Sequence, residues 1–206
     1  VTTLNHGGNT TKQVYDGVGN LVNETSPNDT AAANGQSAVF TYDNVNRLRT
    51  QSDPWSKNYA QYVYNVNDHV TQVTGPNNTI TTYRYDDLGN LLQEVSPDRG
   101  TTTYTYDAAG NVRSTTDARN ITVNYTYDPL NRRVLTDYPS TADVTATYDT
   151  APGCTNGLGR VCTTQDGIQT VNYAYDNFEH LTQLTTTLQG QTYTTAYTRD
   201  PWGRVT

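Results

Sequence analysis

A tyrosine followed by an aspartate, or by a close variant, recurs along the whole chain at a nearly fixed spacing. Nine copies occur in 206 residues, and four consecutive steps between them are 21 residues long. Such regularity marks the units of a repeat architecture. The first residues of the copies are Tyr15, Tyr42, Tyr64, Tyr85, Tyr106, Tyr127, Tyr148, Tyr175 and Arg199. We expect residues 1–206 to form one array of these units, with insertions near 28–38 and 150–158 where the step lengthens to 27 residues.

Each unit has the pattern of a β-hairpin. Tyr83 and Tyr85 flank Arg84, so the two rings point to one face of a strand and Arg84 points to the other. The next residues predict a tight turn, because Asp accepts hydrogen bonds from main-chain amides and Gly or Asn three residues later adopts a positive φ. The residues to which we assign this structural role are Tyr15, Asp16, Gly19, Tyr42, Asp43, Tyr64, Tyr85, Asp86, Gly89, Tyr106, Asp107, Gly110, Tyr127, Asp128, Tyr148, Asp149, Tyr175, Asp176, Asp200 and Gly203.

A second short strand with an apolar residue follows each turn. These residues are Leu21, Leu48, Val70, Leu91, Val112, Val134, Val161, Leu181 and Val205. The chain also holds 39 Thr and 17 Tyr, which favour strands. A flat ribbon of some eighteen strands is unstable, because strands twist and its Tyr-, Leu- and Val-bearing face needs cover. We therefore predict an all-β fold of tandem β-hairpin repeats of about 21 residues, forming a long antiparallel meander that curls or spirals as part of a shell or array.

Three units depart from the pattern. Asn65 replaces the turn aspartate, Glu179 stands where Gly or Asn is usual, and Arg199 replaces the repeat tyrosine. These turns are expected to be the loosest or the most specialised.

The charge pattern excludes two classes of partner. The formal net charge is −7, and Lys and Arg form no cluster that could bind phosphates or anionic lipid. The longest apolar runs span a few residues, far short of the roughly 20 that a membrane helix requires. We expect neither nucleic acid nor membrane as a partner. Because the chain does not begin with Met, we expect it to be part of a longer one.

The pattern Tyr-Asp-x-x-Gly-Asn-Leu at Tyr85–Leu91 resembles the YD repeat of the RHS family, and the resemblance covers the whole chain. This family includes bacterial polymorphic and insecticidal toxins, cell-wall-associated bacterial proteins and animal teneurins. The resemblance implies a β-ribbon that spirals into a hollow shell, which in the toxins encloses the cytotoxic C-terminal region. It implies a non-catalytic structural segment of a secreted or cell-surface protein, whose partners are the remainder of its own shell and an enclosed C-terminal polypeptide.

The alternative is an extracellular adhesion or carbohydrate-binding array, which would bind surface glycans or assemble with further copies of itself into filaments. In other family members the repeats have been linked to carbohydrate binding and adhesion. The recurring Tyr-Asp pairs each meet a local structural need, so a glycan site would lie elsewhere. The candidates are Trp55, Tyr59 and Tyr138, which lie in the second turns, the turns that close one unit before the next begins. Apolar sugar faces stack on such aromatic rings.

Cys154 and Cys162 lie in and beside the second insertion and flank Gly157 and Gly159. These glycines let the chain reverse, so the two thiols could meet across the mouth of a hairpin. In an extracytoplasmic chain this spacing favours a disulfide. The alternative is a pair of reduced, half-buried thiols.

No residue pattern indicates catalysis, a cofactor or a metal site. His6, His69 and His180 are scattered, two cysteines lack partners for zinc, and the calcium-binding loop patterns are absent. Arg199–Arg204 resembles the Asp-Pro-x-Gly start of the family's core, where toxin members carry an aspartyl self-cleavage activity. The same stretch also aligns with an ordinary repeat, and no second acid pairs with Asp200. We expect no enzyme activity and no cofactor.

Overall fold

The computed structural model describes residues 1–6, 9–25, 37–52, 59–200 and 202–206. Within these residues the chain forms 18 strands and one short 3-10 turn, η2 (Pro76–Asn78). The strands are β1 (Thr2–His6), β2 (Asn9–Tyr15), β3 (Leu21–Thr25), β4 (Ser37–Tyr42), β5 (Leu48–Ser52), β6 (Tyr59–Tyr64), β7 (Val70–Thr74), β8 (Ile80–Tyr85), β9 (Leu91–Ser96), β10 (Gly100–Tyr106), β11 (Val112–Thr116), β12 (Thr122–Tyr127), β13 (Arg133–Asp137), β14 (Val144–Tyr148), β15 (Val161–Gln165), β16 (Gln169–Tyr175), β17 (Leu181–Leu188) and β18 (Gln191–Ala196).

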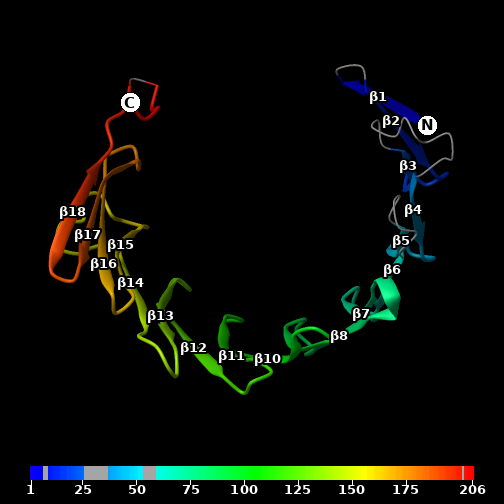
Figure 1. Ribbon diagram of the computed structural model, residues 1–206, viewed down its shortest axis with the longest axis horizontal. Coiled ribbons are helices and arrows are strands. Elements are labelled where there is room, and N and C mark those ends of the chain that lie inside the picture. The colour runs from blue at the N-terminus through cyan, green and yellow to red at the C-terminus, as the bar shows by residue number, and fades with distance from the viewer. Residues whose placement is uncertain (7–8, 26–36, 53–58, 201) are drawn as a thin grey trace. The chain divides into compact units, whose positions relative to one another are not determined.

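The strands follow one another as an antiparallel meander (Figure 1). The chain divides into two compact units, Val1–Thr102 and Thr103–Thr206. In the first unit β1 to β9 each pair with their neighbours in sequence, and in the second unit β10 to β18 do the same. The predicted all-β meander of hairpins is confirmed. The first insertion, near 28–38, lies largely outside the described residues.

The first turn of each repeat is fixed by its aspartate. Asp86 Oδ1 accepts hydrogen bonds from the main-chain N–H groups of Leu88 and Asn90, at 3.0 and 2.8 Å. The N–H of Gly89 donates to the carbonyl of Asp86 at 3.1 Å, and Gly89 has a φ of +86°. At the equivalent position of four other repeats a residue other than Gly takes a φ of 60° to 74°. These residues are Asn46, Asp68, Asn131 and Glu179.

A β-bulge accompanies eight of the nine first turns. Tyr85 lies opposite Leu91, whereas Arg84 lies opposite Gln93, so Leu92 has no partner in the ladder. The same register shift occurs at the repeat tyrosine of all eight described hairpins that close on one. A bulge increases local twist and redirects the side chains beside it. It sets the orientation of the repeat tyrosine.

The two faces of the sheet differ as the Tyr-x-Tyr pattern predicts. In β8, Tyr83 and Tyr85 are half-buried while Thr82 and Arg84 are exposed, and β6, β12 and β14 alternate in the same way. Among the described residues only Cys162 and Ala174 are buried apolar side chains. Because one sheet layer cannot enclose a core, stability must come from contacts repeated along the ribbon.

The return strand of the sixth repeat opens with a charged residue. Arg133 stands at its first position and the predicted Val134 at its second, because Tyr127 pairs with Arg133 in the same register in which Tyr85 pairs with Leu91. The Arg133 guanidinium lies 5.6 Å from the centre of the Tyr125 ring. A cation–π contact thus allows a cation at a position that is apolar in the other repeats.

Of the three turns expected to be the loosest or the most specialised, two keep the hydrogen bonds or the backbone geometry of the other repeats. Asn65 Oδ1 accepts from the N–H groups of Asn67 and His69 at 2.9 and 3.0 Å, as the aspartates do. Glu179 adopts a φ of 74° and forms an ion pair with Arg160. These substitutions keep the turn and change only its charge.

Candidate functional site

The repeat tyrosines join each repeat to the one before it. The Tyr64 hydroxyl donates to the Leu48 carbonyl at 2.8 Å, and Leu48 opens the return strand of the preceding repeat. The main-chain ladder between β5 and β6 ends at the pair Thr50 and Gln61, so the Leu48 carbonyl lies beyond it. A carbonyl left without a partner is costly where water has poor access. The tyrosine hydroxyl supplies the missing donor.

The same bond recurs in both units, and we call this series of hydrogen bonds the Tyr ladder. It joins Tyr42 to the Leu21 carbonyl at 2.9 Å, Tyr127 to Val112 at 3.0 Å, Tyr148 to Arg133 at 3.1 Å and Tyr175 to Val161 at 2.8 Å. Arg199, which stands where a tyrosine is expected, donates from Nη2 to the Leu181 carbonyl at 3.3 Å. An arginine therefore takes over the role of the tyrosine hydroxyl in the ninth repeat.

A second ladder, which we call the turn ladder, runs along the first turns and was not predicted. It is formed by the residue that ends each first turn, four positions after the turn aspartate or Asn65. In the repeat with the insertion this residue is Arg160, eleven positions after Asp149. It is always Asn, Arg or His. Asn111 Nδ2 donates to Asp107 Oδ2 at 3.0 Å within its own turn and to Asn131 Oδ1 at 2.9 Å in the next one. The restriction of this position to three residue types was the signal in the sequence. The members are Asn20, Arg47, His69, Asn90, Asn111, Arg132, Arg160, His180 and Arg204.

Arg132 forms a bidentate link in this turn ladder. Its Nε donates to Asp128 Oδ2 at 2.7 Å, and its Nη1 and Nη2 donate to Asp149 Oδ1 and Oδ2 at 3.0 and 2.6 Å. Together with a hydrogen bond from the Gly159 N–H, this guanidinium lowers the pKa of Asp149 to about 2. The two carboxylates in turn raise the pKa of Arg132. Such bidentate pairing fixes the distance between adjacent turns.

Ring contacts add to both ladders. The guanidinium of Arg47 lies 4.7 Å from the centre of the Tyr64 ring, and that of Arg132 lies 4.4 Å from the Tyr148 ring. His69 stacks on Tyr85 with the ring centres 4.7 Å apart. Each contact joins a turn to the tyrosine of the next repeat, so the Tyr ladder and the turn ladder support each other.

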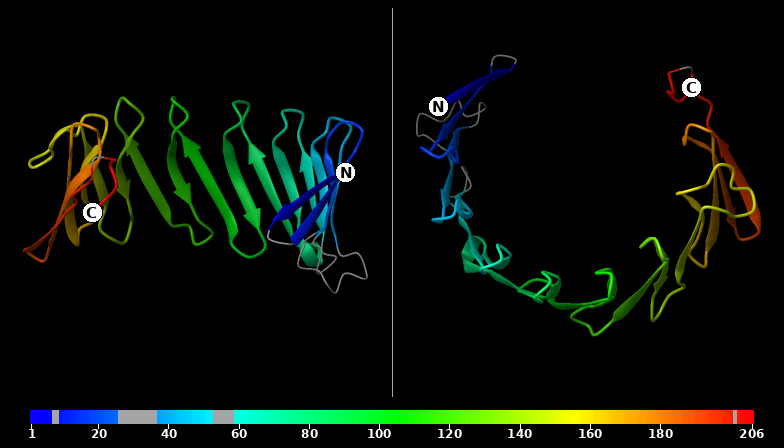
Figure 2. Two further views of the ribbon diagram at one scale, coloured as in Figure 1. Left: turned by 90° about the horizontal axis from the view of Figure 1, so that it is seen from above. Right: turned by 180° about the vertical axis from the view of Figure 1, so that it is seen from behind.

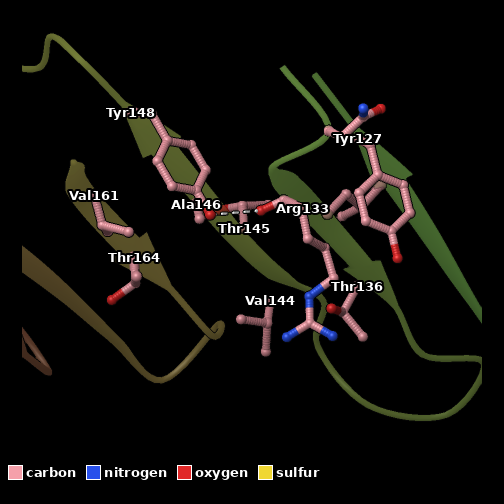
Figure 3. A pocket seen from close by; sticks show the side chains of 11 residues that line it. Tyr127, Arg133, Thr136, Val144, Thr145, Ala146, Tyr148, Val161 and Thr164 are labelled. Carbon is pink, nitrogen blue, oxygen red and sulfur yellow. Dashed lines mark hydrogen bonds between the residues drawn. The ribbon is translucent and has the colours of Figure 1, made fainter. Parts of the chain in front are cut away.

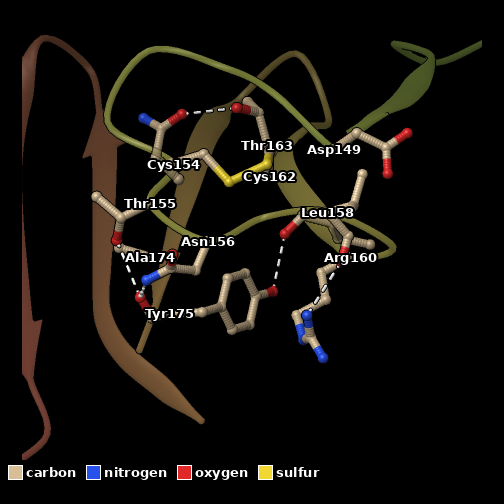
Figure 4. The surroundings of a disulfide bond; sticks show 12 residues. Asp149, Cys154, Thr155, Asn156, Leu158, Arg160, Cys162, Thr163, Ala174 and Tyr175 are labelled. Atoms are coloured by element: carbon tan, nitrogen blue, oxygen red, sulfur yellow. Dashed lines mark hydrogen bonds between the residues drawn. A yellow bond between two sulfur atoms is a disulfide. The ribbon is translucent and has the colours of Figure 1, made fainter. Parts of the chain in front are cut away.

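The second insertion is held by the disulfide between Cys154 and Cys162 (Figure 4). Cys162 lies in β15 and is fully buried, and Cys154 lies in the loop, with the two Cα atoms 5.3 Å apart. The insertion covers the otherwise exposed face of the sheet, because Ala174 is buried although equivalent residues such as Arg84 are exposed. Thr155 Oγ1 and Asn156 Nδ2 both donate to the Tyr175 carbonyl, at 3.0 and 2.9 Å.

The first turn at Asp149 keeps its hydrogen bonds although the insertion lies within it. Asp149 Oδ1 still accepts from the Gly159 N–H at 2.7 Å, ten residues later, and the Asp149 N–H donates to the Arg160 carbonyl at 3.0 Å. Gly157 is required here, because a Cβ atom would lie 2.3 Å from the Sγ atoms of both cysteines. The loop is therefore a compact addition to an ordinary repeat.

One open groove of about 490 Å³ lies on the tyrosine-bearing face across β12 to β15 (Figure 3). Tyr127, Arg133 and Tyr148 are among its lining side chains, with Val144 and Thr136. No carboxylate, cysteine or histidine lines it, so it holds no general base or nucleophile–base pair. Within the part of the chain that the structure describes, no group of three or more His, Cys, Asp or Glu side chains is placed to hold a metal ion.

Two of the three candidate glycan-contact residues lie among the described residues. Tyr59 opens β6 in the first unit and is exposed, and Tyr138 follows β13 in the second unit and is also exposed. Trp55 lies outside the described residues. Their role in glycan binding stays a prediction. No helix among the described residues is long and apolar enough to cross a membrane.

Solved structures of other proteins share the fold of this chain. Among solved structures, the Photorhabdus luminescens Tc holotoxin pore aligns with a TM-score of 0.73 and 18% identity over 96% of this chain and 12% of the other. The crystal structure of TcdB2-TccC3 aligns with a TM-score of 0.72 and 17% identity over 96% of this chain and 13% of the other. The chain thus spans only a small part of the length of these proteins, and the likeness shows a shared fold.

No curated protein matches the chain. A family model does: the one described as Teneurin YD-shell matches residues 2–147. Because this match covers more than half of the chain, the protein belongs to the teneurin YD-shell family.

Proposed function

We propose that this chain is a non-catalytic wall segment of a secreted or cell-surface shell, and that the shell encloses a C-terminal polypeptide of the same protein. Membership of the YD-shell family and the fold shared with Tc toxin structures support the structural role. We propose in addition that the protein is secreted, that a polypeptide is enclosed and that the segment has no catalytic activity.

The observation that carries the proposal is the Tyr ladder. The recurring side chains that could bind a ligand or do chemistry are already engaged in holding the ribbon together. The Tyr127 hydroxyl is bonded to the Val112 carbonyl, and the Asp128 carboxylate is bonded to two main-chain amides and to Arg132. A wall needs this arrangement, because its repeats must hold a fixed spacing without a core.

The partly exposed rings on one face of the sheet support enclosure. The tyrosine-bearing face of each unit carries half-buried rings that a single layer leaves partly open to water. Apolar surface that is removed from water stabilises a fold by roughly 25 cal/mol per Å². A polypeptide lying against this face would gain that stabilisation.

Limited proteolysis of the complete protein tests the proposal. The full reading frame that contains this segment is expressed and the purified product is treated with a nonspecific protease, with and without a denaturant that opens the repeats. The matched control is the C-terminal polypeptide expressed alone. We expect the C-terminal region to survive within the intact protein and to be digested rapidly in the control and after denaturation. Equal digestion in the intact protein and the control would show that nothing is enclosed.

A further inference from the structure

Two neighbouring strands of the second unit depart from the repeat pattern on the tyrosine-bearing face. The residue two positions before the repeat tyrosine, or before Arg199, is aromatic in seven of the nine repeats, but in β14 it is Ala146. The first residue of the return strand is apolar in eight of the nine repeats, but in β13 it is Arg133. β13 and β14 pair with each other in the row of strands that the left view of Figure 2 shows. The aromatic residues of the other repeats are Phe40, Tyr62, Tyr83, Tyr104, Tyr125, Tyr173 and Tyr197.

The groove of about 490 Å³ lies where the ring is missing. Ala146 lines this groove and lies opposite Thr164 in the ladder between β14 and β15, so two short side chains face each other there. Val144 and Val161 line it as well (Figure 3). An aromatic side chain covers roughly 150–250 Å² of apolar surface, and the methyl group of Ala146 leaves part of such a surface open to water. The groove therefore has room for an apolar side chain from another segment.

Arg133 brings a single positive charge to this groove. Among the residues that the ladders place on the tyrosine-bearing face of β10 to β18, it is the one charged residue. Its guanidinium lies near the ring of Tyr125 but forms no ion pair and no side-chain hydrogen bond within the described residues. A guanidinium has five N–H donors, and a carboxylate is the group that accepts from them in a bidentate manner. No carboxylate of this chain lines the groove.

The main chain of Arg133 is held from both sides. Its residue pairs with Tyr127 in the ladder between β12 and β13, and its carbonyl accepts a hydrogen bond from the Tyr148 hydroxyl at 3.1 Å. Figure 3 shows the guanidinium projecting into the groove between Val144 and Thr136. The charge is thus presented from a fixed position, beside the space that the missing ring leaves.

We propose that this groove is a docking site for an acidic side chain of the enclosed C-terminal polypeptide, together with an apolar or aromatic side chain next to it. The carboxylate pairs with Arg133, and the apolar side chain occupies the space over Ala146. This inference rests on the enclosure proposed above and adds the chemistry by which the wall recognises the polypeptide. Because the rest of the face carries no charge in its ladders, the contact is a single point of attachment and not a general electrostatic attraction.

Two variants each restore the ordinary repeat and remove one half of the site. Arg133→Leu removes the charge, and Ala146→Tyr fills the groove with the ring that most repeats carry. The matched controls make the same replacements on the opposite face: Arg84→Leu in β8, and Thr147→Tyr beside Ala146 in β14. Both site variants introduce residue types that other repeats already hold at the same position, so they should fold, and circular dichroism checks this.

Photo-cross-linking in the complete protein tests the proposal. The photo-reactive amino acid benzoylphenylalanine is placed at Val144 or, separately, at Val161, both of which line the groove. After irradiation the cross-linked peptides are identified by mass spectrometry. We expect a cross-link to a segment of the C-terminal polypeptide that contains Asp or Glu beside an apolar residue. Its yield should fall about tenfold in Arg133→Leu and in Ala146→Tyr, because each removes one of the two contacts, and it should be unchanged in the controls.

The outcomes distinguish this inference from the enclosure on which it rests. A C-terminal polypeptide that survives the protease, yet is cross-linked from neither position or equally well in Arg133→Leu, would overturn the docking site and leave the enclosure standing. A cross-link to a basic or uncharged segment, or to another part of the wall, would overturn the docking site as well. If the polypeptide is digested as fast as the control and nothing is cross-linked, both proposals fail.

Discussion

The hydroxyl of Tyr64 donates a 2.8 Å hydrogen bond to the main-chain carbonyl of Leu48, one repeat earlier in the chain. The bond lies where the main-chain ladder between β5 and β6 has already ended. The strands of adjacent repeats separate near the first turn, and the tyrosine hydroxyl spans the separation. The defining tyrosine of this repeat is therefore both a ring on the sheet face and an extension of the backbone ladder.

The first prediction concerns that hydroxyl. Tyr64→Phe keeps the ring but leaves the Leu48 carbonyl without its donor, and it should lower the free energy of unfolding by about 1 kcal/mol. Urea unfolding followed by circular dichroism measures the change. Tyr83→Phe is the control, because Tyr83 lies on the same face and its hydroxyl makes no hydrogen bond within the described residues. Equal losses in the two variants would assign the effect to the phenol generally and not to this bond.

The second prediction concerns Arg199, which bonds to the Leu181 carbonyl in place of a tyrosine. Its Nε is buried without a hydrogen-bond partner, so the arginine fits this position imperfectly. Arg199→Ala should destabilise by about 1 kcal/mol, because the carbonyl loses its donor. Arg199→Tyr should leave stability unchanged or raise it, because it restores the hydroxyl and removes the unpaired Nε. Thermal unfolding of the two variants decides this, and a tyrosine variant as unstable as the alanine variant would refute the equivalence.

Most of the fold could be predicted from the sequence because its determinants are local. The strand alternation depends on residues two apart, as with Tyr83 and Tyr85, and the turn depends on Asp86 and Gly89 within four residues. Repetition then confirms each assignment eight or nine times. In the sixth repeat the apolar residue Val134 comes second in its strand, after Arg133, because an arginine can replace an aliphatic residue when a tyrosine ring lies beneath it.

The contacts between repeats could not be predicted in the same way. The bond from Tyr64 to Leu48 spans 16 residues, and the one from Arg132 to Asp149 spans 17. They depend on the bulge at the tyrosine, and no single residue type predicts that bulge. The turn at Asn65, expected to be among the loosest or the most specialised, keeps its hydrogen bonds, since the amide oxygen of Asn accepts main-chain hydrogen bonds as a carboxylate does.

The third prediction concerns the disulfide between Cys154 and Cys162. In the chain-entropy model, a closed loop of about nine residues stabilises by roughly 2.5 kcal/mol. Reduction should therefore lower the unfolding midpoint and expose the face at Ala174, which the insertion covers. Urea unfolding with and without a phosphine reductant measures the loss, and a thiol count under denaturing conditions checks the oxidation state. The double variant Cys154→Ser with Cys162→Ser is the control, and its midpoint should not respond to the reductant.

A companion variant tests whether the loop or the bond matters. Gly157→Ala places a methyl group against both sulfur atoms, so the loop must shift even though the disulfide can still form. We expect it to increase hydrogen exchange at Ala174 and at the Tyr175 N–H, which donates to the Thr155 carbonyl at 3.0 Å. Unchanged exchange at both residues would show that the insertion does not hold that face.

The fourth prediction concerns acid. Hydrogen bonds from Arg132, followed by one from the Gly159 N–H, lower the pKa of Asp149 to about 2 in the folded chain. The unfolded value is about 3.9. A carboxyl whose folded pKa is the lower one contributes stability above the unfolded value, and this contribution is lost as the pH falls from about 4 towards 2. Asp128 has a lowered pKa as well, chiefly because of the main-chain hydrogen bond from Arg132, and it contributes in the same direction.

Urea midpoints measured across that pH range should therefore fall for the wild-type chain, and they should fall less for Asp149→Asn, which keeps an acceptor oxygen but carries no charge. The chain already contains this substitution, because Asn65 holds a first turn without a carboxylate. Asp87→Asn is the control, since Asp87 makes no ion pair or side-chain hydrogen bond within the described residues, and it should follow the wild-type curve. If Asp149→Asn follows that curve too, the link from Arg132 to Asp149 does not contribute to the acid sensitivity of the ribbon.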